Sequence, residues 1–275
     1  PSDSHVLRVW HAPKGVIAHN ELSGSSVDSN SGRHALKMHG PSETELADTG
    51  ASGLDGRTRY VIVAQNLIGG SGPWPMAIGP QDGGQDERLE DIVIEQNRFF
   101  SGFGTQSCCS SPVQVALQLW ARHVTVRNNI FSGEGASNYF TGIAVGQRGV
   151  EPAPLGVRIF NNTFYRVTTA GQEPPLAVQI GAKADKTQVR NNLAHFAPAG
   201  ALLGGAGSGL VEDHNLVTQN AALADPGAAD FLNKDFRPKA TSAAVGAGVA
   251  GLVFDDLEGA LRAASVDLGA LIAAP

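Results

Sequence analysis

The sequence predicts an all-β chain folded as a right-handed parallel β-helix, a solenoid in which successive coils stack on one another. Two recurring strand patterns and a composition rich in Gly indicate this fold. Both patterns return at intervals of about one coil, and their apolar residues keep the same places within the repeat. Such a repeat buries its apolar side chains only against its neighbours, which is typical of a solenoid.

The first pattern is a short alternation of apolar residues that ends in Asn and a hydrophobic pair. It occurs as VIAHNEL (16–22), VIVAQNLI (61–68), IVIEQNRFF (92–100), VTVRNNIF (124–131), VRIFNNTF (157–164), TQVRNNLA (187–194) and LVEDHNLV (210–217). The recurring residues are Asn20, Asn66, Asn97, Asn129, Asn162, Asn192 and Asn215, at steps of 46, 31, 32, 33, 30 and 23 residues. Most steps exceed a minimal coil, so we expect loops to project from many coils.

The second pattern is a strand that precedes the first one. It occurs as HVLRVWHA (5–12), HALKMHGP (34–41), WPMAIGPQ (74–81), VALQLWAR (115–122), TGIAVGQR (141–148) and LAVQIGAK (176–183). Because side chains alternate across a strand, the two patterns predict three inward columns. These are Leu7, Leu36, Met76, Leu117, Ile143, Val178; then Val9, Met38, Ile78, Leu119, Val145, Ile180; and Ile17, Val63, Ile94, Val126, Ile159, Val189. We therefore expect two strands per coil.

The column of asparagines is best explained as scaffold. At a sharp bend between strands, a buried Asn amide can bond the backbone and the Asn of the next coil, forming a ladder. Asn also tolerates left-handed backbone angles. Loss of one such residue, as in Asn129→Leu, is expected to destabilise the chain by about 1–3 kcal/mol.

Composition limits the class of partner. The chain is 42% hydrophobic and has 34 Gly, but only 17% of its residues are charged, which suits short strands and turns. A net charge of −6 argues against nucleic acid, and no apolar run reaches the length of a membrane span. The start at Pro1, without Met, suggests a processed or trimmed chain. The adjacent pair Cys108 and Cys109 does not form a disulfide framework and does not identify a compartment.

The end of the chain resembles the tail of many secreted bacterial β-helix proteins, of the form DFRL…SPAIDAG…D..G..R…DIGA. The matching residues are Asp235-Phe236-Arg237, Ser242-Ala243, Gly246-Ala247-Gly248 and Asp267-Leu268-Gly269-Ala270, whereas 257–259 and 263–264 depart from this form. With the Asn ladder over residues 5–220, this resembles the pectate-lyase-like parallel β-helix superfamily. The resemblance implies β-helix coils at 1–220, a capping tail at 221–275 that covers the last coil, and a secreted or cell-surface protein.

The resemblance also implies chemistry on the outer face of the first coils. In some β-helix lyases a Lys and an Arg on neighbouring coils act as base and acid, with calcium at the substrate carboxylate. Lys37 and Arg8 resemble that pair in type and placement, so Lys37 is the expected base and Arg8 its charge-stabilising partner. His39 is the expected acid, because Arg8 does not readily give up a proton. The equally plain interpretation is a solvated face of polar side chains.

Residues for binding a polysaccharide and a metal complete the predicted site. Candidate sugar contacts are Trp10, His11, Arg33, Gln118, Trp120 and Arg122. The acidic segment 82–95 contains the candidate calcium ligands Asp82, Asp86 and Glu87, and a solvated acidic loop is the competing interpretation. His34, His39, His11 and His19 form a loose cluster without the spacing of a zinc site.

Three functions remain open from the sequence. The first is a lyase acting on a uronate-containing polysaccharide. The second is a non-catalytic surface, adhesin or fibre module, favoured by the Ala and Gly of the outward columns after residue 140. The third is a glycoside hydrolase, which needs two carboxylates at one cleft, with Asp82 and Asp86 as candidates. No N-terminal cap is recognisable, so a missing N-terminal segment or a neighbouring domain is expected at the first coil.

Overall fold

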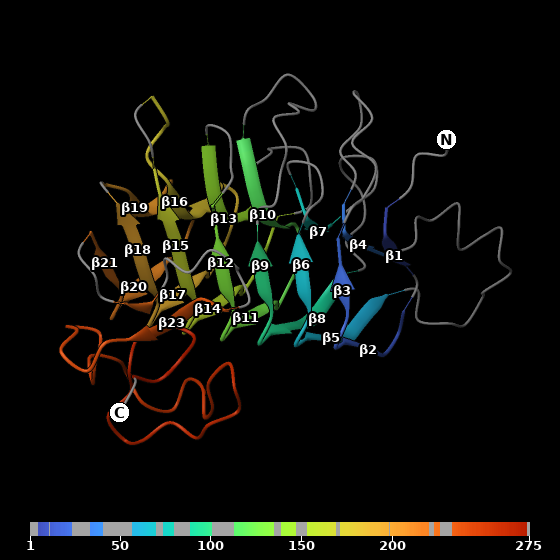
Figure 1. The fold of residues 1–275 in the computed structure, drawn as a ribbon. Helices are drawn as coiled ribbons and strands as arrows, with labels where there is room; N and C mark the ends of the chain where they lie inside the picture. Colours follow the sequence, from blue (N-terminus) through green and yellow to red (C-terminus); the bar gives the residue numbers. More distant parts are fainter. Residues whose placement is uncertain are drawn as a thin grey trace, which may run out of the picture.

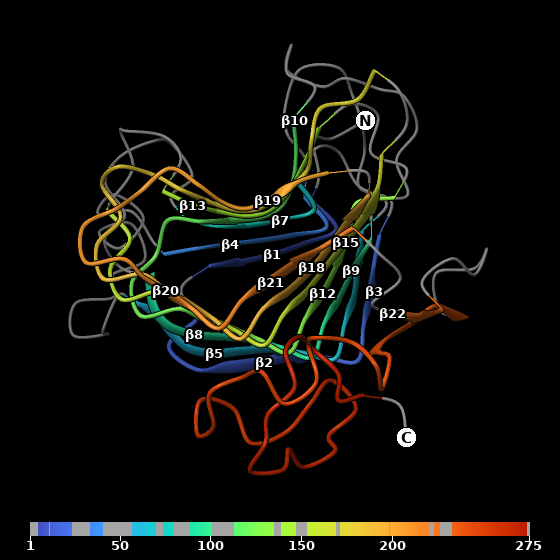
Figure 2. The same ribbon diagram turned by 90° about the vertical axis from the view of Figure 1, so that its left-hand side faces the viewer.

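The protein is a parallel β-helix built from three parallel sheets of seven strands each (Figure 1). The computed structural model describes residues 5–10, 12–23, 34–40, 57–69, 74–79, 89–100, 113–134, 139–146, 153–168, 171–197, 199–219, 223–225 and 233–273. Each coil gives one strand to each sheet, and the sheets line three sides of the solenoid (Figure 2). The predicted fold class is confirmed.

The first sheet, sheet A, consists of β1 (Leu7–Trp10), β4 (Leu36–His39), β7 (Met76–Ile78), β10 (Val113–Leu119), β13 (Tyr139–Val145), β16 (Leu176–Ile180) and β19 (Ala201–Gly204). Sheet B consists of β2 (Gly15–Ala18), β5 (Thr58–Ala64), β8 (Leu89–Glu95), β11 (Thr125–Arg127), β14 (Arg158–Phe160), β17 (Gln188–Arg190) and β20 (Val211–Asp213). Sheet C consists of β3 (Glu21–Leu22), β6 (Leu67–Gly69), β9 (Arg98–Phe100), β12 (Ile130–Ser132), β15 (Thr163–Val167), β18 (Leu193–Ala197) and β21 (Leu216–Thr218).

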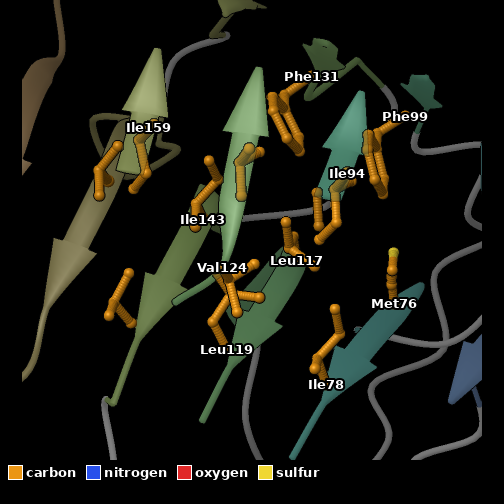
Figure 3. Close-up of a cluster of buried hydrophobic side chains, with 14 of the residues drawn as sticks. Met76, Ile78, Ile94, Phe99, Leu117, Leu119, Val124, Phe131, Ile143 and Ile159 are labelled. Carbon is orange, nitrogen blue, oxygen red and sulfur yellow. The ribbon is translucent and has the colours of Figure 1, made fainter. Parts of the chain in front are cut away.

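Sheet C corrects the expectation of two strands per coil. The hydrophobic pair that follows each ladder Asn is itself a strand, of two to five residues. Its inward side chains form a column in which Phe99, Phe131 and Phe164 stack, with ring centroids 4.6 Å and 5.1 Å apart. Stacked aromatic side chains bury a large apolar area, so this third strand closes the core (Figure 3).

The predicted inward columns are confirmed in register. Leu117 pairs with Met76 and Ile143, Leu119 pairs with Ile78 and Val145, and Val126 pairs with Ile94. The central members of all three columns are fully buried in one core cluster that runs through the solenoid (Figure 3). Core packing therefore follows directly from the alternation in the sequence.

The Asn ladder is also confirmed. Each ladder residue from Asn20 to Asn192 donates from Nδ2 to the Oδ1 of the next one, at 2.9–3.1 Å. Each Oδ1 also accepts the backbone N–H of the Asn one coil earlier, as between Asn97 and Asn129 at 2.9 Å. From Asn97 to Asn192 the residues are completely buried. The left-handed conformation of the bend lies one residue earlier than expected, at positions such as Gln96 and Asn128, with φ of 56° and 54°.

The C-terminal tail begins with the hairpin of β22 (Leu223–Asp225) and β23 (Asp235–Pro238), which pair antiparallel. The described contacts of the tail run along the flank of the coils, to Gln96, Asn128, Asn161 and Asn191, rather than over the last coil as expected. The tail lies below the solenoid in both views (Figures 1 and 2). It is held there because the residues before the ladder Asn point their amides outward and bond its backbone.

Arg262 organises this tail and corrects the interpretation of the tail sequence. Its guanidinium donates to the carbonyls of Asp255, Asp267 and Gly269 and to Asn128 Oδ1, at 2.7–3.1 Å. Asp256, Gly259 and Arg262 thus keep the D..G..R spacing that seemed lost at 257–259 and 263–264. Ile130, Tyr165 and Leu193 of sheet C pack with tail residues in a second apolar cluster.

No residue in the described part of the chain belongs to a helix with the length and apolar character needed to cross a membrane.

Candidate functional site

The outer face of sheet A brings together the basic residues predicted for catalysis. Arg8 pairs with Lys37, and Trp10 pairs with His39, between the adjacent strands β1 and β4. The outward column continues in register through Ala77, Gln118, Ala144 and Gln179. Neighbouring strands lie about 5 Å apart, so Arg8 and Lys37 are immediate neighbours on this face.

His39 orients Arg8. The Arg8 Nε–H donates to His39 Nε2 at 2.9 Å, and His39 Nδ1 lies 2.9 Å from the carbonyl oxygen of Gly40. Since the arginine nitrogen is always a donor, Nε2 accepts and the proton of a neutral imidazole is on Nδ1. Both ring nitrogens are engaged, so His39 in this state has no proton to offer a substrate from Nε2. The geometry supports a positioning role for His39 rather than that of the acid.

The face is enclosed at β4 and open to solvent at β1. Lys37 is 8% exposed and His39 is 1% exposed, whereas Trp10 is 43% exposed and Arg8 is also exposed. The Trp10 ring stacks on His39 with centroids 6.1 Å apart and planes inclined by 18°. Trp10 therefore presents an aromatic surface for stacking on a sugar ring, beside the buried Lys37 and His39.

Trp120 and Gln118 are buried and do not form the exposed sugar platform expected from the sequence. Trp120 is 6% exposed, and it fills the space that the missing side chain of Gly79 leaves, where a Cβ would come within 2.8 Å of its ring. Its Nε1 is buried and makes no hydrogen bond to any residue that the structure describes. Arg122 lies at the corner between sheets A and B, in the ladder of bridges that joins Glu90 and Leu155.

The remaining predicted binding and metal residues, His11, Arg33, Asp82, Asp86 and Glu87, lie outside the described residues. At the described end of the acidic segment, Glu90 pairs with Arg57 and Asp91 lies 3.5 Å from His123. Among the residues that the structure describes, no group of three His, Cys, Asp or Glu side chains is placed to hold a metal ion.

Cross-coil ion pairs form on sheet B. Arg127 Nε donates to Glu95 at 2.7 Å, and Arg190 Nε donates to Asp213 at 2.6 Å. The Arg190 hydrogen bond lowers the pKa of Asp213, and His214 adds to this effect while burial opposes it. The carboxylates of Glu95 and Asp213 therefore hold adjacent coils together.

A cluster of titratable side chains between sheet C and the tail was not predicted. Lys234 lies 3.0 Å from Glu134 and above the ring of Tyr165, on which His195 stacks at 5.5 Å. Burial raises the pKa of Tyr165 to about 12, and the charge of Glu134 and a hydrogen bond to it add to the effect. The sequence does contain a signal for this cluster. Ser132, Tyr165 and His195 occupy the same position in successive coils, one residue after the inward column that contains Phe131 and Phe164, and this position points outward.

We expect Tyr165 to ionise only near pH 12 in the folded protein. Because the folded state holds the phenol proton more tightly than the unfolded chain, the free energy of unfolding should fall as the pH rises from about 10 to about 12, by about 2 kcal/mol. Urea unfolding across this window measures the fall. Tyr165→Phe should remove this part of the pH dependence and the late phenolate absorbance. A late absorbance step of unchanged size in the variant would assign the shift to another tyrosine.

Comparison of the sequence with known proteins does not assign the chain to a family. No protein-family model matches the chain, and no curated protein matches it. The structure establishes the fold, a parallel β-helix.

Proposed function

We propose that the protein binds an acidic polysaccharide on the outer face of sheet A and cleaves it beside a uronate unit by β-elimination, as pectate-lyase-like enzymes do. The observation that carries this proposal is the neighbouring pair Arg8 and Lys37, with Arg8 oriented by His39. The stacked, half-exposed Trp10 supports a sugar-binding role for the same face. On this proposal the protein acts outside the cell or at its surface.

The proposed reaction assigns one task to each side chain. The Arg8 guanidinium neutralises the uronate carboxylate, which makes the proton on C5 more acidic. The neutral amine of Lys37 removes that proton, the C4=C5 double bond forms, and the C4–O bond breaks. The leaving oxygen takes a proton from water. His39 holds Arg8 in place and does not touch the substrate.

The scheme is written without calcium, because the expected ligands Asp82, Asp86 and Glu87 lie outside the described residues. In it, Arg8 neutralises the substrate carboxylate. A calcium ion held by those residues would add to that neutralisation.

The test is an assay of the wild type on a panel of uronate-containing polysaccharides, following the ultraviolet absorbance of the unsaturated product. On any polysaccharide that is degraded, Lys37→Ala should lose more than about tenfold in rate, since a positioned general base contributes about 10²–10⁴. Lys14→Ala is the control, because Lys14 is an exposed lysine of the preceding coil, between β1 and β2. If Lys37→Ala stays folded and keeps more than about a tenth of the activity, Lys37 is not the base.

A non-catalytic glycan-binding module is the second candidate. It is favoured by the burial of Lys37 and His39 and by the engagement of both His39 nitrogens. It is also favoured by the small side chains Ala77 and Ala144 in the same column. In the same assay, a wild type that retains an acidic polysaccharide, releases it at high salt and yields no unsaturated product supports this candidate.

A further inference from the structure

A pocket lies where the C-terminal tail meets the bend between sheets B and C, on a different side of the solenoid from sheet A. Its volume is about 240 Å³. It is lined by Gln65, Asn66, Leu67, Gln96, Arg98, Leu257 and Glu258. The pocket therefore has walls from two coils and from the tail, and none of its lining residues belongs to the predicted lyase site.

The two glutamines of the pocket are held in fixed orientations. Gln96 Nε2 donates to the carbonyl oxygen of Asp256 in the tail at 2.8 Å, and its Oε1 accepts from Gln65 Nε2 at 3.2 Å. Both residues adopt left-handed backbone angles, with φ of 56°, that turn them outward from the ladder. A row of amides that is bonded in this way is preorganised for further hydrogen bonds.

Arg98, a partly exposed residue, lines the same pocket. Its Nη1 is buried and makes no hydrogen bond to the described residues. Burial lowers the pKa of Arg98, and the charges of Glu258 and Asp235 oppose that effect, so the guanidinium has opposite charge nearby. A guanidinium carries five N–H donors, so the other nitrogens of this partly exposed side chain can donate to a molecule in the pocket.

The pocket also contains an acceptor and two apolar walls. Glu258 accepts from Arg237 Nη2 at 2.9 Å, which leaves its carboxylate further lone pairs. Leu67 and Leu257 line the pocket with aliphatic surface. Arg98 and Glu258 balance each other in charge, so the lining gives no preference to an ion of either sign.

We propose that this pocket binds one neutral sugar unit. Each sugar hydroxyl both accepts and donates, so a bound sugar can accept from Arg98 and donate to Glu258, while the C–H face of the ring packs on Leu67 and Leu257. The volume lies below the roughly 300–1,000 Å³ of sites for drug-sized ligands, which suits a single ring. The site stands apart from Arg8 and Lys37 and does not depend on the lyase proposal.

The test is a titration of the ¹⁵N-labelled protein with methyl glycosides of neutral hexoses and pentoses, followed by NMR shifts of the pocket residues. At least one glycoside should bind with a Kd of about 1–10 mM, as expected for a small ligand. Arg98→Met should weaken binding about tenfold. The exposed Arg158 gives the matched control Arg158→Met, which should bind as the wild type does.

Two further variants keep the test decisive. Gln65→Ala should also weaken binding and leaves the Gln96 anchor of the tail intact, so it serves if Arg98→Met disturbs folding. Trp10→Ala should leave the affinity unchanged, which separates this pocket from the face of sheet A. The proposal is overturned if no neutral glycoside shifts the pocket resonances up to about 100 mM. It is also overturned if Gln65→Ala binds as tightly as the wild type, or if a uronate binds the pocket more tightly than the neutral sugars.

Discussion

Asn129→Leu is expected to lower the free energy of unfolding by about 3–5 kcal/mol, more than the sequence alone suggests. The Asn129 amide donates to the carbonyls of Ile94 and Arg127 and to Asn162 Oδ1, at 2.9–3.0 Å. Its Oδ1 accepts the backbone and side-chain N–H groups of Asn97. Leu replaces none of these bonds, and the residue is completely buried, so water cannot replace them either.

The matched control is Asn20→Leu at the exposed start of the same ladder. Asn20 donates to Asn66 and to the carbonyl of Ala18, but its position on the first coil is exposed. Water can therefore replace the lost bonds, and the expected cost is below about 1 kcal/mol. Urea unfolding of both variants measures the difference. Equal losses for the two substitutions would mean that burial of the ladder does not set its strength.

The sequence predicted the parts of this fold that depend on alternation. The columns headed by Leu7, Val9 and Ile17 and the asparagine ladder needed only a period of two and a repeat of the motif. The third strand was missed because segments such as Ile130–Ser132 are too short for alternation to be visible. Its signal was the recurrent aromatic residue two positions after the Asn, as at Phe131.

The candidate site was predictable only as a neighbourhood. Register fixes Arg8 beside Lys37 and Trp10 beside His39, and these placements were predicted. Alternation divides inward from outward positions but does not tell whether an outward position stays open to solvent. The burial of Trp120 shows this, because its ring packs against Gly79 of the preceding coil, a contact that no local pattern encodes. The Arg8–His39 hydrogen bond, across a diagonal between strands, was likewise not visible in the sequence.

The flank position of the tail has a cause in the sequence that motif matching alone does not reveal. The residue before each ladder Asn is turned outward by its left-handed angle, and Asn128, Asn161 and Asn191 therefore offer a second row of amides. The tail carbonyls of Asp255, Asp267 and Val249 accept from that row. Coils with His19 or His214 at this position lack such an amide, which explains why the contacts with the tail fall on the coils between them.

Arg262→Met is expected to weaken docking of the tail by about 2–4 kcal/mol. Met keeps the aliphatic stem but loses the guanidinium, which donates to three tail carbonyls and to Asn128. Hydrogen bonds from a charged group are worth about 1.5–3 kcal/mol each, and part of the loss is recovered because burial disfavours the charge, as the lowered pKa of Arg262 indicates. Hydrogen exchange of residues 244–273 should accelerate, whereas the ladder amides of Asn97 and Asn129 should exchange as before.

Arg237→Met is the matched control, since it removes an arginine of the same tail whose partners, Glu258 and Asp235, are at the surface. Surface ion pairs contribute about 0–1 kcal/mol, so the exchange of the tail should change little. The two outcomes separate two ways of holding the tail. If Arg262→Met leaves the tail as protected as the wild type does, the apolar contacts of Phe236 and Leu268 with sheet C hold it without the arginine. If instead the ladder amides also lose protection, the tail and the coils unfold as one cooperative unit, and its flank position stabilises the whole solenoid.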